Sequence, residues 1–271
     1  MEKLICYDSK GISFNVDKTF TAYKIAEVLK NDLRNDTRSY GFSLKLLSLK
    51  EFSHNYAVSI PSNFNTNEGY ALLIKDNQAI IGSDTGKGCF YALASLSQII
   101  VTSKENEVRS LLIIDYPDME TRGFNLCYHV INPTLPNLAP SFDYVIKAIK
   151  HLANMKMNTV LIEFETMFPF KKYSILQNEI TFTREQILQF KKVCDDNFVK
   201  VVPLVQSLGH VYYVLHHKEF AHLREVPRTT QQYCPTNEEC SKFYCELVDE
   251  ILEVFDNVQY FHMGGDESRR L

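Results

Sequence analysis

The sequence has 271 residues, of which 45% are hydrophobic and 23% are charged. This balance is that of a globular protein with one large domain or two modest ones, and it excludes a disordered, collagen-like or low-complexity chain. The net charge of -4, from 29 Lys and Arg against 33 Asp and Glu, disfavours nucleic acid as the main partner.

The chain begins without a recognisable targeting segment. Residues 1–14 contain no apolar stretch followed by a small-residue cleavage site, and no apolar run elsewhere is long enough to span a bilayer. We therefore expect a cytoplasmic protein without a membrane partner. The seven cysteines are scattered and odd in number, so buried thiols are expected rather than a disulfide framework.

Residues 1–115 are predicted to form an N-terminal α+β domain, because few strands and two helices occur out of strict alternation. The predicted elements are a helix over residues 21–33, strands over residues 42–49, 70–75 and 79–81, a helix over residues 89–101 and a strand over residues 111–114. The polar residues between the second and third of these strands predict a hairpin turn.

Residues 116–271 are predicted to alternate regularly between strands and helices. The strands cover residues 123–130, 159–164, 201–205 and 258–263, and the helices cover residues 141–157, 183–198 and 238–255. Thr183 with Gln186, and Thr236 with Glu239, fit capping boxes at the starts of the last two helices. Apolar strands in this alternation predict a parallel sheet with helices packed outside it.

Four strands with their helices take little more than half of the roughly 250 residues of an eight-unit barrel. We therefore predict an α/β protein in which the N-terminal α+β domain is followed by the first half of a (β/α)8 TIM barrel. The alternative is an open doubly wound sheet, which usually has a Gly-rich turn after its first strand. No such turn follows residues 123–130.

Two adjacent acids, Asp266 and Glu267, follow the fourth predicted strand, at the end where a barrel carries its chemistry. Neighbouring strand residues point to opposite faces, so both acids reach one cleft only if the backbone bends. Gly264 and Gly265 permit such a bend, since glycine tolerates positive φ. One carboxyl group would then act as a general acid while the other stays charged. Without the glycines and the barrel position, two solvated loop acids would be the favoured interpretation.

The segment HMGGDE at residues 262–267 resembles the signature of the family 20 glycoside hydrolases, the β-N-acetylhexosaminidases. Further segments are similar to that family: YPDMETRG (116–123), NMKMNTV (154–160), ETMFP (165–169), VPLVQSLGH (202–210) and CPTNE (234–238). The segment at 202–210 is closest to the hexosaminidase D-like branch. Residues 69–96 resemble the hairpin and helix of the α+β domain that precedes the family's barrel, so the resemblance covers most of the chain.

The resemblance implies an exo-acting enzyme that removes terminal β-linked N-acetylglucosamine or N-acetylgalactosamine from a carbohydrate substrate by substrate-assisted, retaining hydrolysis. The 2-acetamido carbonyl of the substrate attacks its own anomeric carbon, an intramolecular step with a large effective concentration. Glu267 would protonate the leaving oxygen and then activate water, and Asp266 would hold the acetamido N–H. No cofactor is implied, and no metal is expected because the histidines and cysteines lack zinc-site spacing.

The resemblance also assigns substrate binding to three further residues. Arg122 matches an arginine that grips hydroxyls of the terminal sugar, which suits the fixed fork of a guanidinium. Otherwise it would be a surface or ion-paired arginine at a strand start. His210 matches a histidine at the third strand end, with a structural, hydrogen-bonded histidine as an equal alternative. Glu165, followed by Thr166, stands where many family members have an Asp pair, and it either enters the site or supports Arg122.

The sequence contains no Trp and ends at Leu271, whereas in the family a Trp-lined pocket and a contacting Tyr come from later strands. We therefore expect a fragment of a longer enzyme that hydrolyses little by itself, unless two copies associate as a homodimer to close the barrel. Two alternatives remain open. One is a non-catalytic carbohydrate-binding relative, and the other is an unrelated barrel in which Arg122 and Glu267 lie at opposite ends.

Overall fold

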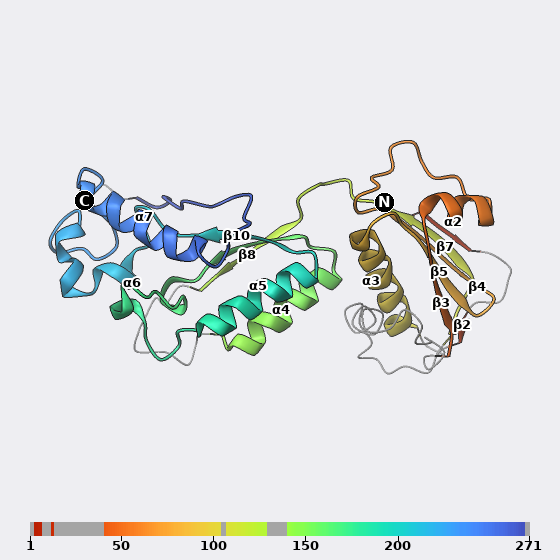
Figure 1. Cartoon of the computed structure of the whole chain (residues 1–271), viewed down its shortest axis with the longest axis horizontal. Coiled ribbons are helices and arrows are strands. Elements are labelled where there is room, and N and C mark those ends of the chain that lie inside the picture. Colours follow the sequence, from red (N-terminus) through yellow and green to blue (C-terminus); the bar gives the residue numbers. More distant parts are fainter. Residues whose placement is uncertain (1–2, 7–11, 14–40, 104–106, 129–139, 269–271) are drawn as a thin grey trace. The chain divides into compact units, whose positions relative to one another are not determined.

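Figure 1 shows the computed structural model of the chain, which describes residues 3–6, 12–13, 41–103, 107–128 and 140–268. The chain divides into two compact units, Met1–Glu120 with Leu152–Lys156, and Thr121–His151 with Met157–Leu271. Among the described helices, none combines the length and the apolar character that a bilayer crossing needs.

A five-stranded sheet forms the first unit, in the order β1-β7-β4-β5-β3. Its strands are β1 (Lys3–Cys6), β3 (Ser43–Leu47), β4 (Tyr70–Lys75), β5 (Gln78–Gly82) and β7 (Leu111–Asp115). Strand β3 pairs with β5 in parallel, and the other three pairs are antiparallel. Two short strands, β2 (Ile12–Ser13) and β6 (Glu107–Val108), form a separate antiparallel pair. This mixed sheet agrees with the predicted α+β domain.

The predicted hairpin between β4 and β5 is confirmed. The two strands pair antiparallel, and the turn residues Asp76 and Asn77 have φ values of 50° and 59°. Two consecutive positive φ values are typical of a tight hairpin turn, and Asp and Asn tolerate them better than most side chains do. The side-chain amide of Asn77 also donates a 3.0 Å hydrogen bond to the carbonyl of Gly41, which ties the turn to the segment before β3.

Two helices accompany the first sheet in the described residues. The predicted helix over residues 89–101 is α3 (Gly86–Thr102), whose N-cap Thr85 accepts a hydrogen bond from the N–H of Gly88. Helix α2 (Leu49–Tyr56) is absent from the sequence prediction, because the apolar pattern of β3 continues into its first residue. Its start is nevertheless encoded locally by a capping box between Ser48 and Glu51. The helix predicted over residues 21–33 lies outside the described residues.

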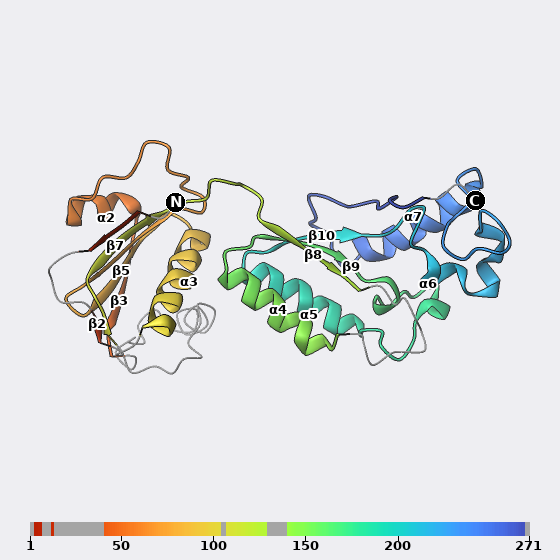
Figure 2. The same ribbon diagram turned by 180° about the vertical axis from the view of Figure 1, so that it is seen from behind.

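Three parallel strands form the sheet of the second unit, in the order β10-β9-β8. They are β8 (Gly123–Cys127), β9 (Thr159–Glu163) and β10 (Lys200–Leu204), and they alternate with helices α4 (Phe142–Asn154), α5 (Arg184–Asp196) and α7 (Glu238–Leu252). Helices α4 and α5 lie side by side along this sheet (Figure 2). Short helical turns follow β9 and β10, namely η3 (Glu165–Met167), η4 (Ser174–Leu176), α6 (Tyr212–Leu215) and η5 (Lys218–Leu223). The predicted α/β class with a parallel sheet is confirmed.

The fourth predicted strand, residues 258–263, is reduced to a single parallel bridge between His262 and Leu204. Backbone hydrogen bonds of 2.9 Å and 3.2 Å join His262 to the β10 side of the sheet. Pairing does not extend beyond this segment because Gly264 and Gly265, with φ values of 65° and 95°, turn the chain out of the extended conformation.

One of the two predicted capping boxes forms. At the start of α5, Thr183 Oγ1 accepts from the N–H of Gln186 at 3.2 Å, and Gln186 Oε1 accepts from the N–H of Thr183 at 2.8 Å. The prediction for α7 is wrong, because the N-cap there is Asn237, one residue after Thr236. The Asn237 side chain accepts from the N–H of Glu239 at 3.0 Å. Asn and Thr are both good N-caps, so residue preference alone does not choose between them.

Buried phenylalanines fix the point where β9 ends. Phe164, directly after β9, is 1% exposed. Its ring centroid lies 5.9 Å from Phe168, 5.7 Å from Phe190 on α5 and 6.0 Å from Phe255. Ring pairs at such separations add packing energy beyond the area that they bury. The side chains that follow Phe164 therefore project from a rigid support.

Candidate active site

The three parallel strands end side by side. In their register Cys127, Glu163 and Leu204 lie in one row, and Leu204 pairs onward with His262. The segment after His262 therefore leaves the sheet at the edge where the carboxyl ends of the strands meet. In parallel β/α folds this edge carries the functional residues.

The two glycines direct the chain after His262. As the sequence predicts, both have positive φ, and the N–H of Gly265 donates to Gln206 Oε1 at 3.2 Å. A Cβ atom at Gly264 would lie 2.0 Å from the same oxygen, so a larger residue there displaces its surroundings. Gln206 is itself buried, with 4% exposed. Its side chain thus fixes the course of the backbone into Asp266.

Both predicted acids reach one histidine. The Nε2 atom of His210 lies 3.5 Å from Oδ2 of Asp266 and 3.4 Å from Oε2 of Glu267. The side chain of His210 is 27% exposed, whereas those of the acids are 64% and 66% exposed. A protonated imidazole pairs with both carboxylates here, and a neutral one can donate to either. Two carboxylates and an imidazole are therefore gathered where water and a ligand have access.

Three of the predicted site residues have a left-handed backbone conformation. Glu165, His210 and Glu267 have φ values of 44°, 55° and 52°. Such values are uncommon for non-glycine residues, and each costs on the order of 1 kcal/mol that the surrounding structure offsets. The backbone is also crowded, because a Cβ atom at Gly209 would lie 2.6 Å from the carbonyl oxygen of Asp266. Strained backbone clusters at functional sites, so this pattern favours a functional interpretation of the edge.

A second group of acids is buried at the end of β9. Glu163 and Glu165 are 3% and 8% exposed. The thiol of Cys127 donates a 3.1 Å hydrogen bond to Oε2 of Glu163. Burial, and then the charges of Glu165 and Glu163, raise the pKa of Tyr213 far above its ordinary value. The Tyr213 hydroxyl therefore stays protonated and can donate a hydrogen bond.

Two residues that contact or surround Glu163 and Glu165 could not be predicted from the sequence. Cys127 is expected among the buried thiols, but its side chain is exposed at the end of β8. Tyr213 gives only a weak signal, its position three residues after His210. Cys89, Cys127, Cys194, Cys234, Cys240 and Cys245 are all free thiols.

Arg122 lies at the opposite edge of the sheet, so its predicted place in the substrate site is wrong. It directly precedes Gly123, which is in register with Thr159 at the start of β9. Its backbone N–H donates to Oδ1 of Asn158 and its carbonyl accepts from the Asn158 N–H, each at 2.9 Å. The length of β8, about 16 Å of extended chain, separates it from the carboxyl edge. For the same reason Glu165, beyond the other end of β9, does not support it.

The chemistry available at the carboxyl edge is proton transfer and hydrogen bonding. Carboxylates can accept protons and N–H groups, and the imidazole can orient them. Within the described ranges no group of three or more His, Cys, Asp or Glu side chains is arranged to hold a metal ion.

Comparisons with known families cover both units. Residues 6–116 match the family described as glycosyl hydrolase family 20, domain 2, and residues 139–270 match the catalytic domain of the same family. The three residues gathered at the carboxyl edge, His210, Asp266 and Glu267, fall inside the second match.

Individual relatives agree with this match. Hexosaminidase D of Bos taurus is 30% identical over 139 residues, which are 51% of this chain and 40% of that protein. The chain thus spans less than half the length of this curated relative.

Solved structures share the fold. A β-N-acetylhexosaminidase from Streptomyces coelicolor A3(2) superimposes with a TM-score of 0.68 at 17% identity, covering 98% of this chain and 58% of that one. A β-hexosaminidase variant from Streptomyces plicatus, solved in complex with its product GlcNAc, has a TM-score of 0.66 at 16% identity. That alignment covers 98% of this chain and 56% of the plicatus chain.

Proposed function

The chain belongs to glycosyl hydrolase family 20, and on this basis we propose that it carries the acid–base centre of an exo-acting β-N-acetylhexosaminidase. The substrate is a glycan or glycoside that ends in β-linked N-acetylglucosamine or N-acetylgalactosamine. The observation that carries the proposal is the contact of one imidazole, His210, with both Asp266 and Glu267 at the carboxyl edge of the parallel sheet. The reaction uses no cofactor.

In the first step the protein supplies one proton and one fixed charge. Protonated Glu267 donates to the glycosidic oxygen as the bond from that oxygen to the anomeric carbon breaks. The carbonyl oxygen of the substrate's own acetamido group bonds to this carbon and gives a cyclic oxazolinium ion. Asp266 accepts a hydrogen bond from the acetamido N–H, and its negative charge stabilises the cation.

In the second step Glu267, now a carboxylate, takes a proton from water. The water oxygen attacks the anomeric carbon, the cyclic ion opens, and the sugar is released with its original configuration. The Glu267 side chain is 66% exposed, which leaves access for this water. Two displacements at the same carbon account for retention.

His210 is proposed to position the two acids, because its imidazole lies within hydrogen-bonding or ion-pairing distance of both. Glu165 is proposed to bind the sugar from the end of β9. A buried carboxylate and the hydroxyl of Tyr213 nearby suit the hydroxyl groups of a pyranose. The choice of sugar is supported by the Streptomyces plicatus relative, which holds GlcNAc as product.

The test uses a thiazoline analogue of the cyclised intermediate of N-acetylglucosamine, since its binding requires no turnover. We expect the chain to bind it, and we expect Asp266→Asn to weaken binding about tenfold or more by removing the charge opposite the ring. Asp256→Asn, at an exposed acid of the same unit, is the matched control and should bind like the parent chain. Equal binding by the parent and Asp266→Asn contradicts the proposal.

A second candidate is a non-catalytic carbohydrate-binding relative, which the wide exposure of both acids favours. Hydrolysis of p-nitrophenyl N-acetylglucosaminide separates the two. For the hydrolase, Glu267→Gln removes all turnover that the parent chain shows. For the binding protein, parent and variant bind the sugar equally and neither exceeds the uncatalysed rate.

A further inference from the structure

Two cysteines outside the group of His210, Asp266 and Glu267 meet at one carbonyl oxygen. The N–H of Cys234 donates to the carbonyl of Leu223 at 2.9 Å, and the thiol of Cys240 donates to the same oxygen at 3.3 Å. Neither cysteine takes part in a disulfide. Because both bonds end on one oxygen, the two cysteines lie beside each other.

The chain between the two cysteines is folded back on itself. The N–H of Asn237 donates to the Cys234 carbonyl at 3.2 Å, and the N–H of Cys240 donates to the Asn237 carbonyl at 3.0 Å. Each of these turns brings the ends of its four-residue segment within about 7 Å, whereas six extended residues would span about 20 Å. The fold of residues 234–240 therefore favours a close pair of thiols.

The two thiols also affect each other electrostatically. Burial raises the pKa of the Cys240 thiol, a hydrogen bond with the backbone of Cys234 lowers it, and the charge of the Cys234 thiolate raises it again. Glu239 and Glu225 raise it further. A charge on one sulfur is thus felt at the other, which agrees with the proximity that the hydrogen bonds indicate.

The two thiols differ in their access to solvent. Cys240 is 6% exposed, whereas Cys234 is half-buried. The Cys234 sulfur lies 3.3 Å from Thr236 Oγ1, so this hydroxyl can donate to a thiolate there. Oxidants attack a thiolate that solvent reaches, and a second cysteine nearby converts the product to a disulfide. Cys234 fits the first role and Cys240 fits the second.

We propose that Cys234 and Cys240 form an oxidation-sensitive dithiol site whose co-reactant is hydrogen peroxide. The Cys234 sulfur attacks one peroxide oxygen, the O–O bond breaks, and a sulfenic acid and water are produced. The Cys240 sulfur then displaces the hydroxyl group from the sulfenic sulfur, and this group leaves with the Cys240 proton as a second water. The two thiols are oxidised to one disulfide, and the peroxide is reduced to water.

The segment before the first cysteine is bonded to both sides of His210. The N–H of Tyr233 donates to the Leu208 carbonyl at 3.0 Å. The Gln231 carbonyl accepts from the N–H of Val211 at 3.4 Å. A covalent bond at the end of this segment therefore restrains the backbone that carries the His210 imidazole.

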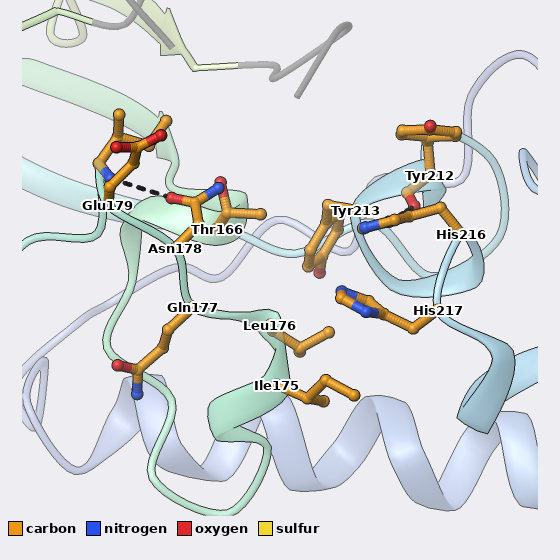
Figure 3. Close-up of a pocket in the computed structure, with 11 residues that line it drawn as sticks. Thr166, Ile175, Leu176, Gln177, Asn178, Glu179, Tyr212, Tyr213, His216 and His217 are labelled. Carbon is orange, nitrogen blue, oxygen red and sulfur yellow. Dashed lines mark hydrogen bonds between the residues drawn. The ribbon is translucent and has the colours of Figure 1, made fainter. Parts of the chain in front are cut away.

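The segment after Leu223 is bonded to helix α6. The guanidinium of Arg224 donates to the Leu215 carbonyl from Nε at 3.0 Å and from Nη2 at 2.7 Å. Helix α6 carries Tyr212 and Tyr213, which line one side of the pocket in Figure 3. Because disulfide formation removes the thiol donor from the Leu223 carbonyl, we expect its effect to extend to α6.

The test treats the parent chain with a slight excess of hydrogen peroxide and then blocks the remaining thiols with iodoacetamide in denaturant. Trypsin cleaves after Arg228 and Lys242, so both cysteines are released in one peptide, residues 229–242. After treatment this peptide should carry no carbamidomethyl group and be about 2 Da lighter than the dithiol form, since a disulfide lacks two hydrogens. Without peroxide, both cysteines should be carbamidomethylated.

Variants separate a specific pair from general oxidation. Cys240→Ser keeps a donor for the Leu223 carbonyl but cannot form the disulfide, so Cys234 should stop at the sulfenic acid, which dimedone traps. Cys245→Ser removes an exposed cysteine of α7 and should leave the disulfide unchanged. The buried thiol of Cys194 should stay reduced throughout. Far-ultraviolet circular dichroism verifies that each variant is folded.

Hydrogen–deuterium exchange tests the connection to His210. In the oxidised parent chain we expect the amides of residues 208–211 to exchange about twofold more slowly or less, and dithiothreitol should restore the original rate. Peroxide that leaves both cysteines open to iodoacetamide, or that links them only between separate molecules, overturns the dithiol site. A disulfide that leaves exchange at residues 208–211 unchanged overturns the connection. None of these measurements uses a sugar, so they do not depend on the proposed function.

Discussion

The two edges of the parallel sheet are built in contrasting ways. At the starting edge, Asn158 is 2% exposed and its backbone and side chain join the starts of β8, β9 and β10. Its bonds include 2.9 Å to Arg122 N, 3.1 Å to Thr159 Oγ1 and 2.8 Å to Lys200 N. At the carboxyl edge, polar groups are gathered by bends in the chain, and the carboxylates of Asp266 and Glu267 remain open to solvent.

The contrast shows that the two edges of one sheet have different roles. The starting edge stabilises the fold, and the carboxyl edge positions the candidate functional side chains. At the starting edge these hydrogen bonds of Asn158 all run to partners within the protein, so they contribute stability. The carboxyl edge accepts positive φ at Glu165, His210 and Glu267, which costs stability but aims their side chains. We therefore expect substitutions at the two edges to affect different measurements.

Gly264→Ala should have the largest effect. The added Cβ would lie 2.0 Å from Gln206 Oε1 at a backbone φ of 65°, so both crowding and left-handed strain oppose it. We expect a loss of about 3 kcal/mol in the free energy of unfolding by urea, and loss of thiazoline binding. Gly123→Ala is the control, because its Cβ would meet Thr159 at an ordinary 3.5 Å. Parent-like stability of Gly264→Ala would show that the bend is not fixed as described.

Asn158→Ala should affect the starting edge alone. It removes the acceptor of the Arg122 N–H at 2.9 Å from a buried position, which should lower the free energy of unfolding by about 2 kcal/mol. Thiazoline affinity, measured where the variant is fully folded, should match that of the parent chain. Asn257→Ala, at an exposed position, serves as the control. A parallel fall in affinity would mean that the two edges are coupled.

His210→Asn should affect the carboxyl edge alone. Asn tolerates the left-handed conformation at φ 55°, so stability should change by less than about 0.5 kcal/mol. Loss of the imidazole between Asp266 and Glu267 should weaken thiazoline binding about tenfold, roughly 1.4 kcal/mol. His222→Asn, at a side chain 55% exposed, controls for loss of an imidazole elsewhere. Unchanged affinity in His210→Asn would remove this residue from the proposed site.

The smallest expected effect is a pH dependence from His217. Its pKa is lowered by burial and then by His216, so the folded state binds a proton less readily than the unfolded state. The associated stability is complete above the ordinary imidazole pKa of about 6.5 and is lost as pH falls below it. The melting temperature of the parent chain should therefore decrease more than that of His217→Gln between about pH 7.5 and about pH 5. His54→Gln, at an exposed histidine of the first unit, should behave like the parent.

The local elements could be predicted from the sequence because their signals are local. The apolar runs at residues 159–164 and 201–205 correspond closely to β9 and β10, and the turn at Asp76 and Asn77 follows from residues that tolerate positive φ. The order of the first sheet could not be predicted, because pairing of β1 with β7 joins opposite ends of that unit. Long-range pairing leaves no periodic signal in the chain.

The grouping of the two acids was predictable, because the glycine pair and the motif indicate the same bend. Gly264 and Gly265 indicate a bend, and the bend brings Asp266 and Glu267 to one imidazole. The position of Arg122 could not be predicted in this way. A motif match beside a strand does not tell which edge of the sheet a side chain occupies. The opposite placement of Arg122 and Glu267 would have favoured an unrelated barrel. The family match excludes that alternative, so the error lies in assigning one residue.

The exposed thiol of Cys127 offers a way to measure ligand binding at the carboxyl edge by fluorescence. It stands in the same row as Glu163 at the strand ends, so a maleimide fluorophore attached there would sense a sugar arriving nearby. Cys245 is also exposed, and replacing it with Ser would leave Cys127 as the most exposed thiol among Cys89, Cys127, Cys194, Cys234 and Cys240. The native sequence thus supplies an attachment point for an optical reporter without a newly introduced residue.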